Sequence, residues 1–146
     1  EDEIKGHFRN EYHKGLINLI FTSKQLNQQF SAILKKHKIT DAPYNVLRIL
    51  RGNKSKIPSS IGYIKERMLD KNSDVSRIVD KLYGLQFIDR QESSTDRRLK
   101  EIAITDKGLK MLSKIDDSEK QVDTFLHNLS DSEVNKLNEL LDKIRG

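Results

Sequence analysis

The amino-acid sequence predicts a mainly α-helical protein: a winged helix-turn-helix lobe flanked by long N- and C-terminal helices. Two short amphipathic helices are joined by a brief turn, a hairpin with arginines in its loop follows them, and helical spacing continues on both sides. We expect residues 42–105 to form the winged lobe and residues 4–38 and 106–145 to form the flanking helices. All of these should belong to one domain, 1–146.

Apolar periodicity defines the elements before the hairpin. A first helix is expected from Ile4 to about Lys38, and a second, opened by Thr40 and an early proline, should end before Gly52. A third helix, capped by Ser59 or Ser60, carries Ile61, Ile64 and Met68, and Ile57 is a candidate for a short third strand beside the hairpin. The wing is therefore expected to have two or three strands.

The fourth helix follows the turn Leu69-Asp70-Lys71 and is expected to be capped by Asn72 or Ser73. Its buried stripe consists of apolar residues at spacings of three and four: Val75, Ile78, Val79, Leu82 and Leu85. The opposite stripe is Ser73, Ser76, Arg77 and Asp80. Short hydroxyls and a guanidinium can approach base edges and phosphates. For this helix alone, an ordinary solvated face is the simpler interpretation.

The hairpin makes DNA binding the better interpretation. Residues 87–91 and 100–105 bracket a polar loop that contains Asp96, Arg97 and Arg98. Two adjacent arginines repel each other, so they indicate an external anion, and Asp96 is placed to hold one guanidinium in position. A narrow, negative minor groove suits such a tip. The alternative is a solvated hairpin with a surface ion pair.

Beyond the hairpin, a helix is expected from Asp106 to about His127, and Ser130 with Glu133 forms a capping box for a last helix. That last helix carries one apolar stripe: Val134, Leu137, Leu140, Leu141 and Ile144. The terminal helices are too long and too one-sided to bury their stripes on a lobe of this size. We therefore expect a homodimer; an intramolecular helical bundle is the alternative.

Composition agrees with a small DNA-binding protein. The chain has 146 residues, 34% of them charged, and a net charge of +5. Residues 48–107 contain 14 Lys/Arg against 9 Asp/Glu, whereas the remainder contains 13 of each, so the whole excess lies in the segment of the helix and wing. We find no apolar run of membrane-spanning length and no signal-peptide pattern, and we expect a cytoplasmic location without membrane partners.

Several other functions have little support in the sequence. Cysteine is absent, which excludes disulfides, thiolate metal sites and thiol switches. The four histidines, His7, His13, His37 and His127, are scattered, so we predict no metal and no cofactor. No catalytic motif is present, and we predict no enzymatic activity. Five residues are weak candidates for lining a ligand pocket, because such residues at helical spacing more often form core: Phe8, Tyr12, Leu16, Phe21 and Tyr44.

The chain resembles the MarR-type (multiple antibiotic resistance regulator) winged-helix transcription factors over nearly its whole length. The specific part is Asp96-Arg97-Arg98, then an apolar strand ending in Thr105, then Lys107-Gly108. The resemblance implies that Ser73, Ser76 and Arg77 face the major groove, that Arg98 enters the minor groove and that Asp96 orients it. It also implies a dimer made by the first and last helices, a pseudo-palindromic site, commonly repression and, in many members, release by an aromatic or lipophilic small molecule.

Two other functions remain open. A ligand-insensitive architectural protein of the same fold would bind DNA without responding to an effector. A winged-helix protein-interaction module would use its fourth helix to bind another protein and not DNA. Arg98, Ser76 and Arg77 discriminate between a DNA-binding regulator and such a module, because removing these side chains should abolish DNA binding but leave partner binding largely intact.

Overall fold

The computed structural model describes residues 7–53, 58–96 and 98–146, which form two compact units. One comprises the described residues up to Leu26 together with Asp117–Gly146; the other comprises Asn27–Asp116. Helix α1 (Glu11–Lys36) is divided between them. The predicted winged lobe, 42–105, lies inside the second unit, which also includes the end of α1 and helix α5 (Asp106–Asp116).

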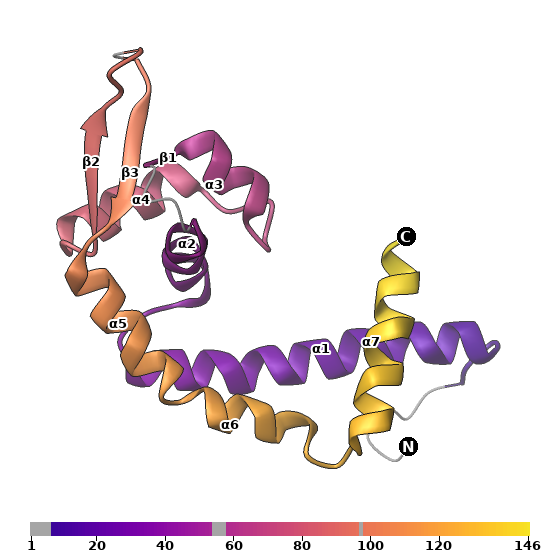
Figure 1. The fold of residues 1–146 in the computed structure, drawn as a ribbon. Coiled ribbons are helices and arrows are strands. Elements are labelled where there is room, and N and C mark those ends of the chain that lie inside the picture. The colour runs from indigo at the N-terminus through magenta and orange to yellow at the C-terminus, as the bar shows by residue number, and fades with distance from the viewer. Residues whose placement is uncertain (1–6, 54–57, 97) are drawn as a thin grey trace. The chain divides into compact units, whose positions relative to one another are not determined.

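The second unit is the predicted winged helix-turn-helix. Its further elements, in chain order, are α2 (Asp41–Gly52), β1 (Ser59–Ser60), α3 (Ile61–Arg67), α4 (Val75–Gly84), β2 (Ile88–Glu92) and β3 (Lys100–Ile104). The three strands form an antiparallel sheet in the order β1-β3-β2, with Ile102 paired to Ser59 on one side and to Arg90 on the other. The β2–β3 hairpin extends away from the helices of this unit (Figure 1). A three-stranded wing is confirmed, whereas Ile57 lies outside the described residues.

The core of this unit is made by the apolar stripes that the spacing predicts. Leu34 of α1, Leu47 of α2 and Ile64 of α3 are fully buried, as are Ile88 and Ile102 of the sheet. Helix α4 contributes Val75, Val79 and Leu82, and helix α5 contributes Leu112 and Ile115. A guanidinium–carboxylate pair between Arg51 and Asp116 further joins α2 to α5, with Arg51 Nη2 donating to Asp116 Oδ1 at 3.1 Å. The sheet and both helices of the helix-turn-helix are thus held by one apolar core.

Both ends of α4 differ from the sequence prediction. The cap is Asp74, whose carboxylate accepts the backbone N–H of Arg77 at 3.2 Å, so Asn72 and Ser73 both precede the helix. At the other end, Leu85 is 44% exposed and not part of the buried stripe. Gln86 has φ 62°, and the N–H of Phe87 donates to the carbonyl of Leu82. This left-handed residue and the bond that follows it form a Schellman stop, which ends the helix before its stripe reaches Leu85.

The sheet passes into α5 through Thr105 and Gly108. The Thr105 hydroxyl donates to the carbonyl of Gln86 at 2.8 Å and accepts the N–H of Gly108 at 3.1 Å. Lys107 reaches back so that its Nζ donates to the carbonyl of Leu85 at 2.9 Å. The α4–β2 turn is therefore fastened to the first turn of α5 by the side chains of Thr105 and Lys107.

Replacing Thr105 by valine should lower the free energy of unfolding by about 1–2 kcal/mol, because it keeps the shape but removes a helix cap and leaves the Gln86 carbonyl without this donor. Urea denaturation measures the change. The matched control is Thr22→Val on the exposed surface of α1, which should change stability by less than about 0.5 kcal/mol. Equal stability of the two variants would contradict the capping role.

The first unit is helical but less regular than predicted. Helix α1 begins at Glu11 because the side chain of Asn10 accepts the N–H of His13 at 2.9 Å. The predicted helix from Asp106 to His127 is broken: α5 ends at Asp116, and the chain continues as α6 (Glu119–Asp123) and a 3₁₀ turn, η1 (Thr124–Leu126). The break falls where the sequence reads Asp116-Asp117-Ser118, residues that compete with helical hydrogen bonding.

The last helix, α7 (Asp131–Arg145), has the predicted capping box at Ser130 and Glu133. Hydrogen bonds from the backbone N–H and hydroxyl of Ser130 lower the pKa of the Glu133 carboxyl. None of the residues of α7 is buried, and Leu140 and Ile144 are 48% and 68% exposed.

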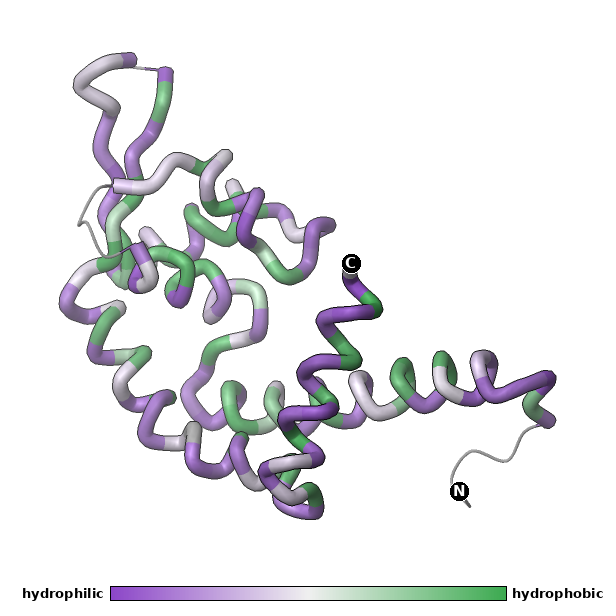
Figure 2. Tube along the Cα trace, turned by 45° about the vertical axis from the view of Figure 1, so that its right-hand side comes forward, coloured by the Kyte–Doolittle hydropathy of each residue, from purple (hydrophilic) through white to green (hydrophobic). Residues whose placement is uncertain are grey.

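Apolar side chains are also exposed along the first half of α1, where Tyr12, Leu16 and Ile20 recur every fourth residue. Figure 2 shows apolar positions recurring along both α1 and α7. Across the part of the chain that the structure describes, no helix has the length and apolar character needed to cross a membrane.

Candidate nucleic-acid interface

Helix α4 presents a polar face next to the wing. Asp74 starts the helix, so Ser76 and Arg77 lie in its first turn, and both are exposed, as are Asp80 and Lys81 further along. Ser73 lies before the cap and is half-buried, with its N–H donating to the carbonyl of Asp70 at 3.3 Å. The predicted stripe is therefore a helical face for Ser76, Arg77 and Asp80, whereas Ser73 belongs to the preceding turn.

Arg90 of β2 joins this helix to the wing. Its guanidinium pairs with the carboxylate of Asp80 and lies 4.3 Å from the ring centroid of Tyr83. The side chain of Arg90 is 29% exposed and that of Asp80 is 67% exposed, so the arginine is the partly covered member of the pair. The spacing in the sequence predicts an exposed Asp80, but it does not predict this pair. Ten positions separate the two residues, and no local periodicity marks them.

The wing tip is ordered by hydrogen bonds close to the predicted arginines. The Asp96 carboxylate accepts the backbone N–H of Arg98 at 2.9 Å, and the carbonyl of Asp96 accepts the N–H of Leu99. Ser93, which is buried, closes the loop by donating its N–H to the carbonyl of Leu99 at 2.8 Å. Asp96 thus positions the backbone from which Arg98 projects. Arg98 is exposed, and Arg97 lies outside the described residues.

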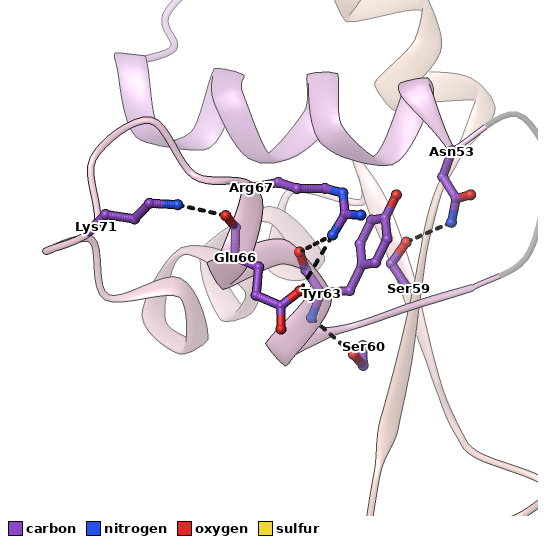
Figure 3. A network of polar contacts seen from close by, with 7 residues as sticks. All are labelled: Asn53, Ser59, Ser60, Tyr63, Glu66, Arg67 and Lys71. Atoms are coloured by element: carbon purple, nitrogen blue, oxygen red, sulfur yellow. Dashed lines mark hydrogen bonds and ion pairs between the residues drawn. The ribbon is translucent and has the colours of Figure 1, made fainter. Parts of the chain in front are cut away.

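Polar contacts connect helix α3 with its cap and with the turn that follows it (Figure 3). Ser60 caps α3, as predicted, by accepting the N–H of Tyr63 at 3.1 Å. The Arg67 guanidinium lies 3.6 Å from the Tyr63 ring centroid, which is a close cation–π contact, and it also pairs with Glu66. Lys71 Nζ donates to the carbonyl of Glu66 at 2.6 Å. The turn between the two helices is thereby tied to α3.

The described residues of this unit line at least two hollows. One, of about 470 Å³, lies between the start of α3, helix α4 and the wing, and is lined by Ser60, Gly62, Ser76, Arg90, Arg98 and Lys100 among others. The other, of about 740 Å³, lies beside α2 and contains Phe30, Tyr44, Arg48, Ile49 and Leu69 in its lining. The rings of Phe30 and Tyr44 are 5.5 Å apart there.

Of the aromatic and aliphatic residues considered for a ligand, Tyr44 lines the second hollow; Phe8, Tyr12, Leu16 and Phe21 belong to the other unit. Among the described residues, no group of three or more histidine, aspartate or glutamate side chains is gathered in a way that would hold a metal ion.

These features define the class of protein. A helix-turn-helix whose second helix exposes serine and arginine, followed by a three-stranded wing with an exposed arginine at its tip, is a winged-helix DNA-binding domain. The MarR family model matches residues 39–100, the segment from the end of the α1–α2 turn to the start of β3. This match to the winged-helix segment, together with the similar proteins described next, supports the MarR family of transcriptional regulators.

The similar proteins agree with this assignment. The chain is 27% identical over 122 residues to the HTH-type transcriptional regulator MhqR of Bacillus subtilis (strain 168), covering 83% of this chain and 82% of that protein. A MarR-like transcription regulator from Bacillus cereus ATCC 10987 superposes with a TM-score of 0.81 at 17% identity, covering 93% of this chain and 97% of the other. The MepR–DNA complex of S. aureus gives 0.75 at 22% identity, covering 94% and 97%. At these identities, the two structures establish the fold.

Proposed function

We propose that this protein is a sequence-specific repressor that binds a pseudo-palindromic DNA site as a homodimer. Ser73, Ser76 and Arg77 would contact the major groove, and Arg97 and Arg98 would contact the minor groove. The observation that carries the proposal is the junction of α4 with the wing, where Arg90 pairs with Asp80 and connects the exposed face of the helix to the strand that leads to the wing arginines. A MepR structure of the same fold was determined with DNA, which supports this use of the fold.

The homodimer is proposed from the exposed apolar stripes of the first unit. Tyr12, Leu16 and Ile20 lie every fourth residue on α1, and Leu140 and Ile144 have the same spacing on α7. Covering an apolar stripe of this kind with another surface is favourable, because it removes apolar area from water. A second copy of the chain supplies such a surface and would place two α4 helices on one duplex, which is the arrangement that a pseudo-palindrome requires.

An effector site is proposed at the hollow beside α2. Phe30, which is half-buried, offers aromatic surface to a small aromatic or lipophilic molecule, whereas Tyr44 beside it is buried in the core; Arg48 lies 5.8 Å from the Tyr44 ring. Leu69, in the turn before α4, also lines this hollow, and its N–H donates to the side chain of Asn45 on α2. A ligand that changes this contact is placed to change the position of α4 and so the affinity for DNA.

Selection of genomic DNA fragments with the purified protein, followed by salt titration of the best site, tests the DNA-binding proposal. We expect a pseudo-palindrome to be enriched. Arg98→Ala should weaken binding by roughly tenfold to a hundredfold and reduce the salt slope by about 2, one contact for each subunit of the dimer. The matched control, Arg9→Ala, removes the same charge from an exposed position in the other unit and should bind with nearly the same slope as the original protein.

The same experiment separates the other functions. Binding to every duplex without enrichment would overturn sequence-specific repression and support an architectural role. Absence of duplex binding at low salt would overturn the DNA-binding proposal and support the protein-interaction role.

A further inference from the structure

The hollow between α3, α4 and the wing has a lining that suits the sugar-phosphate backbone of DNA. We propose that it holds the sugar-phosphate strand that runs from the major groove contacted by α4 to the minor groove contacted by the wing. This inference rests on the proposed function and adds three residues to the interface: Gly62 of α3, and Leu99 and Lys100 of the wing.

The charge of the lining fits a phosphodiester backbone. Arg90, Arg98 and Lys100 contribute three positive charges, against one negative charge from Asp80. Asp80 is already paired with Arg90, so the cations that remain for a ligand are Arg98 and Lys100. Both are exposed, and only Leu99 separates them in the sequence of the hairpin. Phosphate groups of DNA bind such cations with release of condensed counterions.

The apolar part of the lining matches the sugars between the phosphates. Leu99, between Arg98 and Lys100, is 52% exposed, and it lines the hollow together with Ile61 and Val79. An exposed leucine at a hairpin tip contributes little to the stability of the protein's own fold. Against DNA, it can cover an apolar face of a deoxyribose while its neighbours contact the flanking phosphates.

The position of the hollow is continuous with both proposed contacts. Its lining includes Ser76, from the face of α4 assigned to the major groove, and Arg98, assigned to the minor groove. The two grooves of a duplex are separated by a sugar-phosphate strand. A protein that reaches into both grooves from one side must therefore accommodate that strand between its two contacts.

Gly62 gives an independent reason to expect a close approach from outside. Glycine is a poor helix former, yet it stands at the second position of α3. The fold itself has room for a side chain, because a Cβ atom there would meet the Ser60 Oγ at 3.7 Å, an ordinary contact distance. Gly62 is exposed and lines the hollow. The absence of a side chain at this position therefore leaves room for a ligand.

The test measures binding to a duplex of mixed sequence, since backbone contacts carry no base information. We expect Gly62→Leu and Lys100→Ala each to weaken binding by about tenfold, with Lys100→Ala also lowering the salt slope by about 2 per dimer. The matched control is Gly84→Leu, which places the same side chain in open space at the end of α4, outside the hollow. It should bind like the original protein, and all three variants should unfold at nearly the same temperature.

The outcomes separate this inference from the function on which it rests. If the original protein does not bind the duplex, the proposed function fails. If Arg98→Ala weakens binding while Gly62→Leu and Lys100→Ala bind like the original protein, the proposed function stands and the inference is overturned. Should Gly62→Leu unfold, Lys100→Ala decides alone, because an exposed lysine at the wing contributes little to the core.

Discussion

Replacing Gly108 by alanine should destabilise the protein by about 3 kcal/mol, a large part of the stability of a small domain. A Cβ atom at this position would lie 2.3 Å from the carbonyl oxygen of Phe87 and 2.7 Å from Cγ1 of Ile104. The Phe87 carbonyl cannot easily move away, because it accepts the N–H of Thr105 at 3.1 Å at the junction of the sheet and α5. The added methyl group must therefore displace backbone.

Urea denaturation followed by far-ultraviolet circular dichroism measures this change. Gly84→Ala is the matched control: its Cβ would contact no other group within 4 Å, and alanine favours helix, so stability should be unchanged or slightly higher. A loss of less than about 0.5 kcal/mol in Gly108→Ala would show that the close contacts relax and that this glycine is not required.

Placing glutamate at both Leu16 and Ile20 should convert the proposed dimer into monomers and lower the affinity for a two-half-site DNA by about 100-fold or more. Leu16 and Ile20 are 55% and 56% exposed in the single chain, so the substitution has little to disturb within one subunit. In a dimer interface, the same carboxylates would be desolvated without partners. Separated subunits also lose the effective concentration that joins the second half-site contact to the first.

Analytical ultracentrifugation gives the oligomeric state, and a DNA titration gives the affinity. Leu69→Glu is the control, because Leu69 is 88% exposed but lies in the other unit, and it should leave the oligomeric state unchanged. A double variant that remains dimeric would show that the exposed stripe of α1 is not the interface.

Much of the fold could be predicted because its signals are local. The apolar spacing in α2, α4 and α7, the capping box at Ser130 and the alternation around Ile102 all depend on residues within a few positions of one another. Such signals act through the geometry of one helix or one strand and can be read without knowing the neighbours.

The errors have physical causes of a different kind. Helix α4 starts later than predicted because three consecutive residues before Val75 can all act as caps, and only the tertiary position selects Asp74. The break after Asp116 depends on the weak helix propensities of single residues, whereas the apolar periodicity of the segment predicts a continuous helix. The strand β1 has two residues, too few for any alternation to show.

The candidate site likewise combines residues that the sequence predicts with contacts that it does not predict. The exposed residues Ser76, Arg77 and Arg98 were found from the sequence because they stand out against the pattern of their own element, and their roles on DNA remain predictions. The pair between Asp80 and Arg90 and the hollow around Gly62 arise from the packing of α4 and α3 against the sheet. Contacts of that kind join distant positions and leave no spacing in the sequence.

The pair between Arg90 and Asp80 bears on how a binding site would be chosen. Since it joins strand β2 to α4, in the proposed function it would help to set the separation between that helix and Arg98 before DNA binds. A duplex must then match that separation, and one that is too wide or too stiff must be deformed at an energetic cost. The affinity of the protein for different DNA sites should therefore depend partly on groove width and flexibility at base pairs that the protein does not touch. Base-pair substitutions between the two contacts of a half-site would then alter affinity without removing any hydrogen bond.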